Sequence, residues 1–461
     1  MKFNCFLLFC SFNIFILSCG KQTIKQPEEL PNTKPNIIFI MVDDLGYGDL
    51  GSFGQKEIKT PAIDKMAIEG TRFTHVYAGS PVCAPSRSTL MTGQHTGHTK
   101  VRGNTSAIEI PELPLPKRIP LAKEDVTIAE LLKMKGYVTG MFGKWGLGEA
   151  TTSGEPNAKG FDEWFGFNNQ RQAHNHYPEY VWHNRDTFLI EANRNEQQGQ
   201  HVHELFSEYA FKFLEMNKDT SFFMYLPYTL PHDKFHATDE FKALYTDKNW
   251  TEQAQTYAAM ISMVDADVKR LMEKLKEYGI TEKTLVFFCS DNGAANRYDG
   301  VFDSSGKLKG RKRDMYEGGI RTPMITWMPG TVPAGKVSDY PWYFPDVLPT
   351  ICEFTKIQAP KNIDGISVLP ALLGEEIPES DRFMYWEFHE KQFAQAVRWK
   401  NWKAVKVDGN PLEIYDLSVD EGEKNNIADT QPEIVEKFNT YLATARTPSI
   451  YWPVEEITSQ N

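Results

Sequence analysis

The sequence has no excess of basic residues, no internal repeat and, beyond its first twenty residues, no long hydrophobic run. Its 461 residues include 50 Lys and Arg against 61 Asp and Glu, which gives a net charge of −11 at pH 7. General nucleic-acid binding needs a basic face, so we expect no nucleic-acid partner. The composition is that of an ordinary globular protein. Any anionic ligand must therefore be bound by a local cluster of basic side chains.

Cysteine is also scarce, with six in the whole chain. Cys5 and Cys10 fall in an N-terminal segment that we expect to be removed. Cys289 and Cys352 lie in apolar surroundings and are predicted to be buried thiols that act as small hydrophobic residues. So few and widely spaced cysteines exclude a disulfide framework. Cys83 has a different local sequence and is considered below.

An apolar run over residues 6–17 follows the N-terminus. It is shorter than the roughly 18 residues that a membrane span needs, but it suits the core of a signal peptide. The run ends Ile-Leu-Ser-Cys-Gly, which resembles a bacterial lipobox with Cys19 as the lipidated residue; a plain signal peptide is the alternative. We expect residues 1–19 to be a lipoprotein signal peptide and residues 20–34 a tether. The protein would then be exported to the periplasm or cell surface, with the lipid anchor as its only membrane contact.

Alternating apolar runs and helical patterns predict the fold of the main body. Fully apolar runs are typical of strands buried on both faces of a parallel sheet, and they occur at 36–42, 137–142, 222–226, 285–290 and 324–328. Helical patterns lie between them, at 61–70, 127–136 and 253–278. This order indicates an α/β sandwich around a mixed, largely parallel sheet over residues 35–355.

The pattern of apolar and polar residues changes after residue 355. Short β-like runs between residues 383 and 414 are separated by turn signals, and a helical pattern covers 432–445. Residues 356–461 are therefore predicted to form a smaller C-terminal α+β domain with a short antiparallel sheet.

Polar residues follow four of the apolar runs directly. In open α/β sheets, ligands bind beyond the carboxyl ends of the strands, and the residues found there are Asp43, Asp44, Lys144, His232, Asp291 and Asn292. Oxygen ligands of this kind suit a hard divalent cation such as Ca²⁺ or Mg²⁺, whereas a zinc site would more usually offer His and Cys. The alternative is a set of separate solvated turns.

Cys83 precedes Pro85 and Ser86, which can open a helix whose N-terminus would face the thiol. Arg87 adds a fixed positive charge close by. Local chemistry alone leaves two interpretations of Cys83 open. It is either a buried small hydrophobic residue or a nucleophilic thiol of low pKa.

The stretch Cys83-x-Pro85-Ser86-Arg87, followed by Thr92-Gly93, resembles the signature of the formylglycine-dependent (type I) sulfatases, which include bacterial carbohydrate sulfatases and arylsulfatase A-like enzymes. The resemblance covers nearly the whole chain after the N-terminal segment, including residues 36–44, 143–145, 231–232, 290–293, 316–323 and 415–417. It implies an alkaline-phosphatase-like sandwich and the activity of a sulfuric ester hydrolase.

The resemblance also implies the parts of the site. Cys83 would be converted to formylglycine by a sulfatase-maturing enzyme, and the hydrate would attack sulfur. One calcium ion would be held by Asp43, Asp44, the modified Cys83, Asp291 and Asn292. Arg87 would fix the modified side chain, Lys144 and Lys312 would bind sulfate, and His232 would act as general acid.

The chain departs from the family at Gly146, where many members have a histidine that contacts the modified cysteine. His174 and His176 are the candidates to replace it. The segment around them resembles that of enzymes acting on sulfated galactose or N-acetylgalactosamine, which implies a sulfated oligo- or polysaccharide as partner. Arg171, His174 and His176 would bind the sugar, with Trp182 as a further candidate.

Four residues of the predicted C-terminal domain either complete the sugar pocket or have a structural role, and the sequence favours the structural role. They are Trp386, Glu387, His389 and Arg398. Two other functions stay open from the sequence. One is a phosphoesterase of the alkaline phosphatase superfamily. The other is a non-catalytic lipoprotein that binds sulfated glycans.

Overall fold

The structure is a computed structural model that describes Met1 and residues 34–378, 380–390 and 392–454. The expected signal peptide, Cys19 and all but the last residue of the expected tether lie outside the described residues. No helix in the described ranges is long and apolar enough to cross a membrane.

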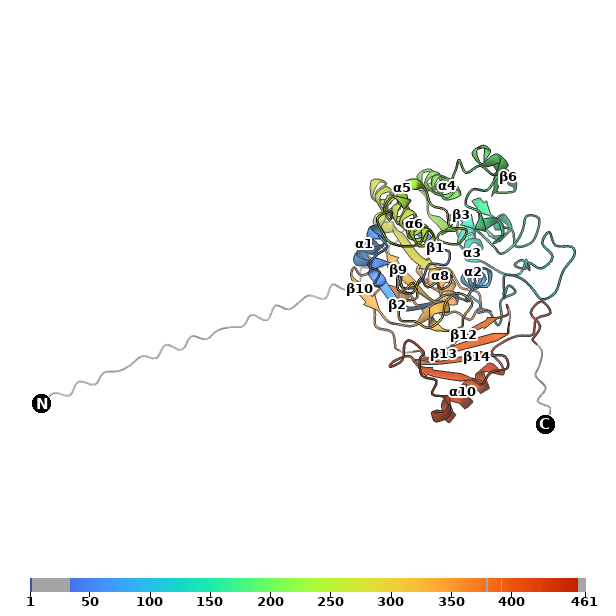
Figure 1. Cartoon of the computed structure of the whole chain (residues 1–461), viewed down its shortest axis with the longest axis vertical. Helices are drawn as coiled ribbons and strands as arrows, with labels where there is room; N and C mark the ends of the chain where they lie inside the picture. The colour runs from blue at the N-terminus through green and yellow to red at the C-terminus, as the bar shows by residue number, and fades with distance from the viewer. Residues whose placement is uncertain (2–33, 379, 391, 455–461) are drawn as a thin grey trace.

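A mixed sheet forms the centre of the molecule (Figure 1). Its main path runs β10-β2-β9-β8-β1-β7-β3-β4-β5-β6, and β11 pairs with β2. The strands are β1 (Asn36–Val42), β2 (Thr71–Tyr77), β3 (Val138–Lys144), β4 (Glu163–Phe167), β5 (Tyr180–His183), β6 (Asp186–Leu189), β7 (Phe222–Pro227), β8 (Thr284–Ser290), β9 (Arg321–Trp327), β10 (Lys336–Ser338) and β11 (Trp342–Tyr343). The five apolar runs correspond to β1, β3, β7, β8 and β9, as predicted.

The central strands β8, β1, β7, β3 and β4 are parallel to one another. β9 is antiparallel to both β8 and β2. The ends of β1, β3, β7 and β8 therefore lie at one edge of the sheet, together with the start of β9. This edge carries the polar residues that the sequence placed after the apolar runs.

Helices cover both faces of this sheet, because its strands are apolar on both sides. In β1, Ile38 and Ile40 face a core shared with α1, α4 and α6, while Ile37 and Phe39 face a core shared with α2, α3 and α8. The helices are α1 (Pro61–Glu69), α2 (Cys83–Thr92), α3 (Ile128–Met134), α4 (Val202–Asn217), α5 (Asp239–Lys242), α6 (Glu252–Glu277), α7 (Glu317–Ile320), α8 (Val347–Phe354), α9 (Leu369–Leu372) and α10 (Pro432–Leu442). The predicted capping box at Thr127 and Glu130 is present at the start of α3.

The C-terminal part contains an antiparallel sheet of β12 (Phe383–Phe388), β13 (Ala394–Trp399), β14 (Trp402–Val407) and β15 (Glu413–Asp416). Its side chains alternate along β12. Trp386 packs toward Tyr77 and Tyr343 of the large sheet, whereas Tyr385 packs on the side that carries Phe438 of α10. Figure 1 shows this sheet between the sandwich and α10.

The chain after α10 returns to the loop that follows α2. Thr447 N donates to Gly97 O at 3.0 Å, and the Trp452 indole Nε1 donates to Lys100 O at 2.8 Å. Arg102 Nη1 donates to Thr447 O at 3.0 Å. Residues 445–452 thus hold the first half of the long loop between α2 and α3.

Candidate active site

Asp43 and Asp44 follow β1 at the carboxyl edge of the sheet. Asp44 has a φ of +67°, in the left-handed region that aspartate tolerates better than most residues. Its backbone N donates to Asp291 Oδ1 at 3.2 Å, which joins the ends of β1 and β8. Both Asp43 and Asp44 are buried, so their carboxylates face the site and not the solvent.

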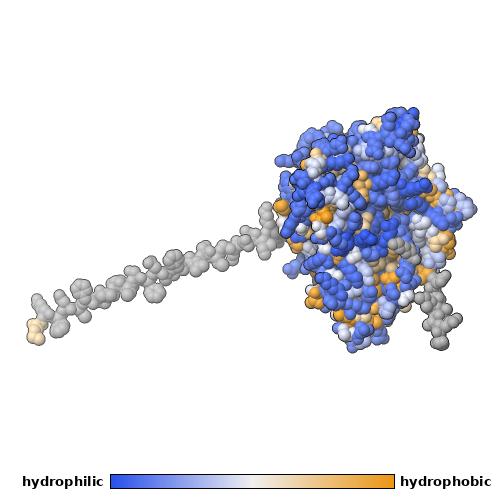
Figure 2. Space-filling view, viewed as in Figure 1, coloured by the Kyte–Doolittle hydropathy of each residue, from blue (hydrophilic) through white to orange (hydrophobic). Residues whose placement is uncertain are grey.

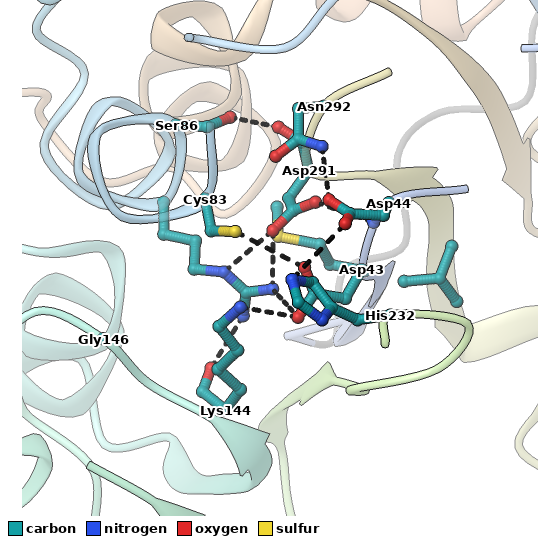
Figure 3. A network of polar contacts seen from close by, with 12 residues as sticks. Asp43, Asp44, Cys83, Ser86, Lys144, Gly146, His232, Asp291 and Asn292 are labelled. Atoms are coloured by element: carbon teal, nitrogen blue, oxygen red, sulfur yellow. Dashed lines mark hydrogen bonds and ion pairs between the residues drawn. The ribbon is translucent and has the colours of Figure 1, made fainter. Parts of the chain in front are cut away.

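Cys83 is the first residue of α2, so the helix begins two residues before the predicted start at Pro85 and includes the cysteine. The first turn is fixed by Ser86, whose Oγ accepts from Gly79 N and donates to the backbone oxygen of Asp291. The Cys83 thiol points toward the carboxylates (Figure 3), with Sγ 3.5 Å from Asp43 Oδ1 and 3.7 Å from Lys312 Nζ. The helix therefore presents residue 83 to the cluster at the sheet edge.

Burial raises the pKa of the Cys83 thiol to about 12, although Lys144 and Lys312 act in the opposite direction. The unmodified thiol is thus protonated at neutral pH. The interpretation of Cys83 as a low-pKa thiol is wrong, because desolvation outweighs the nearby cations.

Arg87 lies one turn further along α2 and is fully buried. Its Nη2 and Nε contact Asp291 Oδ2 at 2.8 and 3.2 Å, and its Nη1 donates to Lys144 O at 2.7 Å. Its guanidinium therefore connects α2 with the ends of β8 and β3.

Two lysines and a histidine face the carboxylates. Lys144 Nζ lies 2.6 Å from Asp43 Oδ2, and Lys312 Nζ lies 2.7 Å from Asp44 Oδ1. His232 Nε2 lies 3.2 Å from Lys312 Nζ and 3.4 Å from Asp44 Oδ2. Three groups that can bind an anion thus converge beside residue 83.

The carboxylates and Asn292 have the chemistry of a cation site. Asp43, Asp44, Cys83 and His232 each offer one donor atom, and these atoms lie within 4.8 Å of one another. Asn292 Nδ2 donates to Asp44 Oδ1 at 2.7 Å, while its Oδ1 is buried without a hydrogen-bond partner among the described residues. A buried amide oxygen beside clustered carboxylates fits a hard divalent cation.

These side chains open into a pocket of about 690 Å³. Its lining includes the predicted residues Asp44, Cys83, His174, His232 and Lys312. It also includes Gln170, which begins the segment around His174 but was given no role, and residues that no motif indicated, namely Asn104, Arg118, Asn296, Arg313 and Glu390. Three of the predicted catalytic residues, Cys83, His232 and Lys312, therefore line one cavity, whereas Arg87 and Lys144 are buried and are not part of its lining.

The structure separates the three proposed sugar-binding residues. His174 lines the pocket and its ring stacks on His232 with centroids 4.3 Å apart. Arg171 is exposed and lies outside the lining of this pocket. His176 is fully buried, 5.5 Å from the His201 ring and 5.9 Å from the His236 ring. Its ring has no exposed surface to offer a ligand, which corrects the expectation that it contacts substrate.

The aromatic and charged residues of β12 and β13 are structural. Trp386 and Arg398 are buried, and Trp386 Nε1 donates to Ala78 O at 2.7 Å. Glu387 is buried as well and binds Arg102, Arg446 and His389. Trp182 packs against the core on one face of the large sheet. None of them lines the pocket that contains Cys83.

Gly146 stands where the resemblance implied a histidine, and it lies in close contact with Gln170. Its φ is +86°, and a Cβ built there would lie 2.3 Å from Gln170 Nε2. Gln170 also donates through Nε2 to Gly146 O at 3.1 Å. The side chain of Gln170 therefore occupies the space that a side chain at residue 146 would need. No sequence pattern indicated that Gln170 lies against Gly146.

The sandwich, with its buried nucleophile position at a helix start and its cluster of carboxylates at the sheet edge, defines a hydrolase of the alkaline-phosphatase-like class. The family description Sulfatase matches residues 35–357, and N-sulphoglucosamine sulphohydrolase, C-terminal, matches residues 310–447. The chain belongs to the sulfatase family and is a sulfuric ester hydrolase, as its motifs predicted.

Relatives and solved structures agree with this assignment. The chain is 32% identical over 375 residues to the N-acetylgalactosamine-6-sulfatase of Sus scrofa, covering 76% of this chain and 68% of that protein. It is 33% identical over 393 residues to an arylsulfatase of Hemicentrotus pulcherrimus, covering 81% and 68%. The crystal structure of Ps i-CgsB in complex with k-i-k-neocarrahexaose superposes with a TM-score of 0.80 at 30% identity, covering 92% of this chain and 96% of that one.

Proposed function

We propose that this sulfatase removes sulfate from a sulfated carbohydrate that contains galactose or N-acetylgalactosamine units, with formylglycine at position 83 and one calcium ion. The substrate class is supported by relatives named for N-acetylgalactosamine 6-sulfate and by the neighbour crystallised with a carrageenan hexasaccharide. The observation that carries the proposal is the position of residue 83. It lies at the N-terminus of α2, between the carboxylate cluster and Lys312.

The reactive group at position 83 is supplied by modification. A formylglycine hydrate provides a hydroxyl nucleophile that the unmodified, protonated thiol does not. Calcium would be held by Asp43, Asp44, Asp291 and Asn292, where it would polarise a sulfate oxygen.

The basic residues of the site bind and orient the sulfate. Lys144 and Lys312 are buried, so their positive charges act in a medium of low polarity and attract an anion strongly. Asp43 and Asp44 raise the pKa of Lys144 and of Lys312, respectively, although burial acts in the opposite direction, so both are charged at neutral pH. The site is thus locally basic in an acidic protein.

His232 is placed to donate a proton to the leaving oxygen. Its Nδ1 lies 2.7 Å from Asp233 Oδ1, which orients the ring and leaves Nε2 facing the pocket. Burial lowers the pKa of His232, but Asp44 and Asp43 outweigh it and raise the pKa above its usual value. A proton held at Nε2 is what a general acid for an alcohol leaving group needs.

The test is sulfate release by the chain produced together with a sulfatase-maturing enzyme. We expect release from a galactose or N-acetylgalactosamine sulfate in a panel that also holds N-acetylglucosamine, fucose and uronate sulfates. We expect none from Cys83→Ala, and the mass of the peptide with residue 83 shows whether conversion occurred.

Two outcomes would overturn the proposal. Release of phosphate from phosphoesters at a higher kcat/KM than of sulfate would indicate a phosphoesterase. Binding of sulfated glycans without turnover, in protein whose residue 83 is formylglycine, would indicate a glycan-binding lipoprotein.

Export and lipidation at Cys19 belong to the same proposal. An exported, anchored sulfatase would meet extracellular polysaccharide, and the N-terminal sequence supports that location. We expect the protein in the membrane fraction of its cells and Cys19→Ala in the soluble fraction. Wild-type protein in the soluble fraction would contradict lipidation.

A further inference from the structure

Arg118 is a basic side chain on the pocket wall that belongs to none of the motifs. It comes from the loop between α2 and α3 and precedes Ile119, which is buried against the body of the protein. Arg118 Nη1 donates to Gln170 Oε1, and both residues line the pocket that contains Cys83. A guanidinium has five N–H donors, so most of those on Arg118 stay available after this contact.

The charge of Arg118 has no counter-ion among the described residues, since no carboxylate there lies within ion-pair distance of it. The other arginine of the pocket, Arg313, pairs with Glu390 at 3.2 Å. Glu149 and Glu390 attract Arg118 from a longer distance. A guanidinium stays charged in proteins, so the wall presents a cation without a partner.

Gln170 holds Arg118 at this position because Gly146 leaves room for it. The amide is fixed at both ends, with Nε2 donating to Gly146 O at 3.1 Å and Oε1 accepting from Arg118. Gln170 itself is buried. The pair is therefore a built feature of the wall and not a side chain extended into solvent.

Arg118 is more exposed than the basic groups that face residue 83. Lys144, Lys312 and His232 are all buried, whereas Arg118 is half-buried. The deep groups are sufficient for the ester sulfate that reacts. An anion at Arg118 would be a different group of the same substrate.

We propose that Arg118, positioned by Gln170, binds a second anionic group of the substrate, a sulfate or carboxylate on the sugar next to the one that loses its sulfate. The proposal rests on the proposed function. The planar guanidinium fork suits both groups, because each can accept two parallel hydrogen bonds. The enzyme would thus prefer densely charged glycans over those with an isolated sulfate.

The test compares substrates that differ only in the neighbouring anion. One pair is κ- and ι-carrageenan oligosaccharides of equal length, in which the ι form has an additional sulfate on the neighbouring sugar. The other is a sulfated chondroitin disaccharide with its uronate carboxylate free or methyl-esterified. For the pair that is hydrolysed, we expect wild-type kcat/KM to favour the more anionic member by about tenfold or more.

Arg118→Gln removes the charge and keeps a polar side chain. We expect it to raise KM for the more anionic member and leave kcat within about threefold, so that the preference disappears, because the interaction acts on bound substrate and transition state alike. Arg118→Lys should keep part of the preference. Arg194→Gln is the matched control, because Arg194 is an exposed arginine that pairs with Glu191 at 2.9 Å. Thermal denaturation shows whether each variant is folded.

The outcomes separate the two proposals. Hydrolysis of no member of the earlier panel and of neither pair by converted wild-type protein counts against the proposed function. Hydrolysis of the panel but of neither pair overturns only the preference for densely charged glycans. Hydrolysis without preference, or a preference that survives in Arg118→Gln, overturns only the role of Arg118. An equal decrease of kcat/KM in Arg118→Gln for both members of a pair would mean that Arg118 acts on the reacting sulfate. That result would also overturn the proposed role of Arg118.

Discussion

Gly146 has a backbone conformation that a side chain would strain, and a neighbour that it would meet. We predict that Gly146→His lowers stability by about 1–3 kcal/mol and lowers activity, because φ is +86° and Gln170 fills the space. Thermal denaturation and sulfate release measure the two effects.

Combining Gly146→His with Gln170→Gly, which removes the clashing amide, should recover part of the stability. A stable Gly146→His variant with faster turnover would contradict this account. It would show that the histidine of other family members can be added here directly.

The buried Asn292 Oδ1, which has no hydrogen-bond partner among the described residues, leads to a prediction about metal removal. We expect a calcium chelator to abolish sulfate release and to lower Tm, because a ligand that binds only the folded state stabilises it. Asn292→Leu should raise the calcium concentration needed to restore both, since it removes one oxygen donor. A Tm that does not respond to calcium in converted wild-type protein would contradict the assignment.

At the scale of residues, the sequence indicated the groups that follow buried strands, because their place at the sheet edge depends only on strand direction. It could not indicate Arg118 or Gln170, which lie in loops whose path depends on tertiary packing. The burial of His176 was also invisible, since its neighbours His201 and His236 come from other parts of the chain. The sequence left two interpretations of Cys83 open, because the burial that raises the pKa of its thiol cannot be read from the neighbouring residues.

At the scale of elements, β12 depends on a buried carboxylate. Glu387 Oε1 accepts from Arg102 Nη1 at 3.1 Å and Oε2 from Arg446 Nε at 2.9 Å. We predict that Glu387→Gln destabilises the protein by about 3–5 kcal/mol, because the buried Arg102 and the half-buried Arg446 lose their charged partner. Glu69→Gln, in an exposed pair with Lys65, is the control and should change stability by less than about 0.5 kcal/mol.

The same residue gives a pH dependence. Burial opposes ionisation of Glu387, but His389 and Arg102 outweigh it and lower its pKa to about 2. Since the unfolded pKa is about 4.3, the carboxylate stabilises the fold fully above that pH, and this contribution is lost as pH falls toward 2. The difference in Tm between wild type and Glu387→Gln should therefore be constant at neutral pH and shrink between about pH 4 and 2. A constant difference down to pH 2 would contradict it.

Elements with a strong local signal were predicted well. The apolar runs of β1, β3, β7 and β8 indicate buried strands directly, and the capping box at Thr127 marks the start of α3. The antiparallel extension β5–β6 was not expected, because Tyr180–His183 and Asp186–Leu189 are short and partly exposed. Their pairing is decided by contact with β4 and not by their own composition.

At the scale of the whole molecule, the three cysteines of the described residues are free and buried. A chain that begins at residue 35 should therefore react slowly with a thiol reagent while folded, and a reductant should leave its Tm unchanged. After denaturation we predict three reactive thiols without the maturing enzyme and two with it. Cys83→Ser should show two in both cases. Three thiols in active protein would contradict formylglycine.

The space-filling view shows a largely hydrophilic face on the main body (Figure 2). It fits the low mean hydropathy of −0.45 and the net charge of −11. A polyanionic glycan is repelled by such a surface at long range, so binding must depend on the few cations at the pocket. The net charge argued against a nucleic-acid partner, but it could not reveal that the pocket itself is locally basic.

The contacts between residues 445–452 and the loop after α2 form only after the end of the chain has been synthesised. Arg102 and its partner Thr447 are separated by 345 residues, which a ribosome takes on the order of tens of seconds to add. The contacts that hold the first half of the loop between α2 and α3 cannot form before then, whatever the speed at which α2 forms. Cys83 is almost fully buried once the chain is folded. If Cys83 is modified as proposed, the modifying enzyme would have to act on the chain before folding buries this residue.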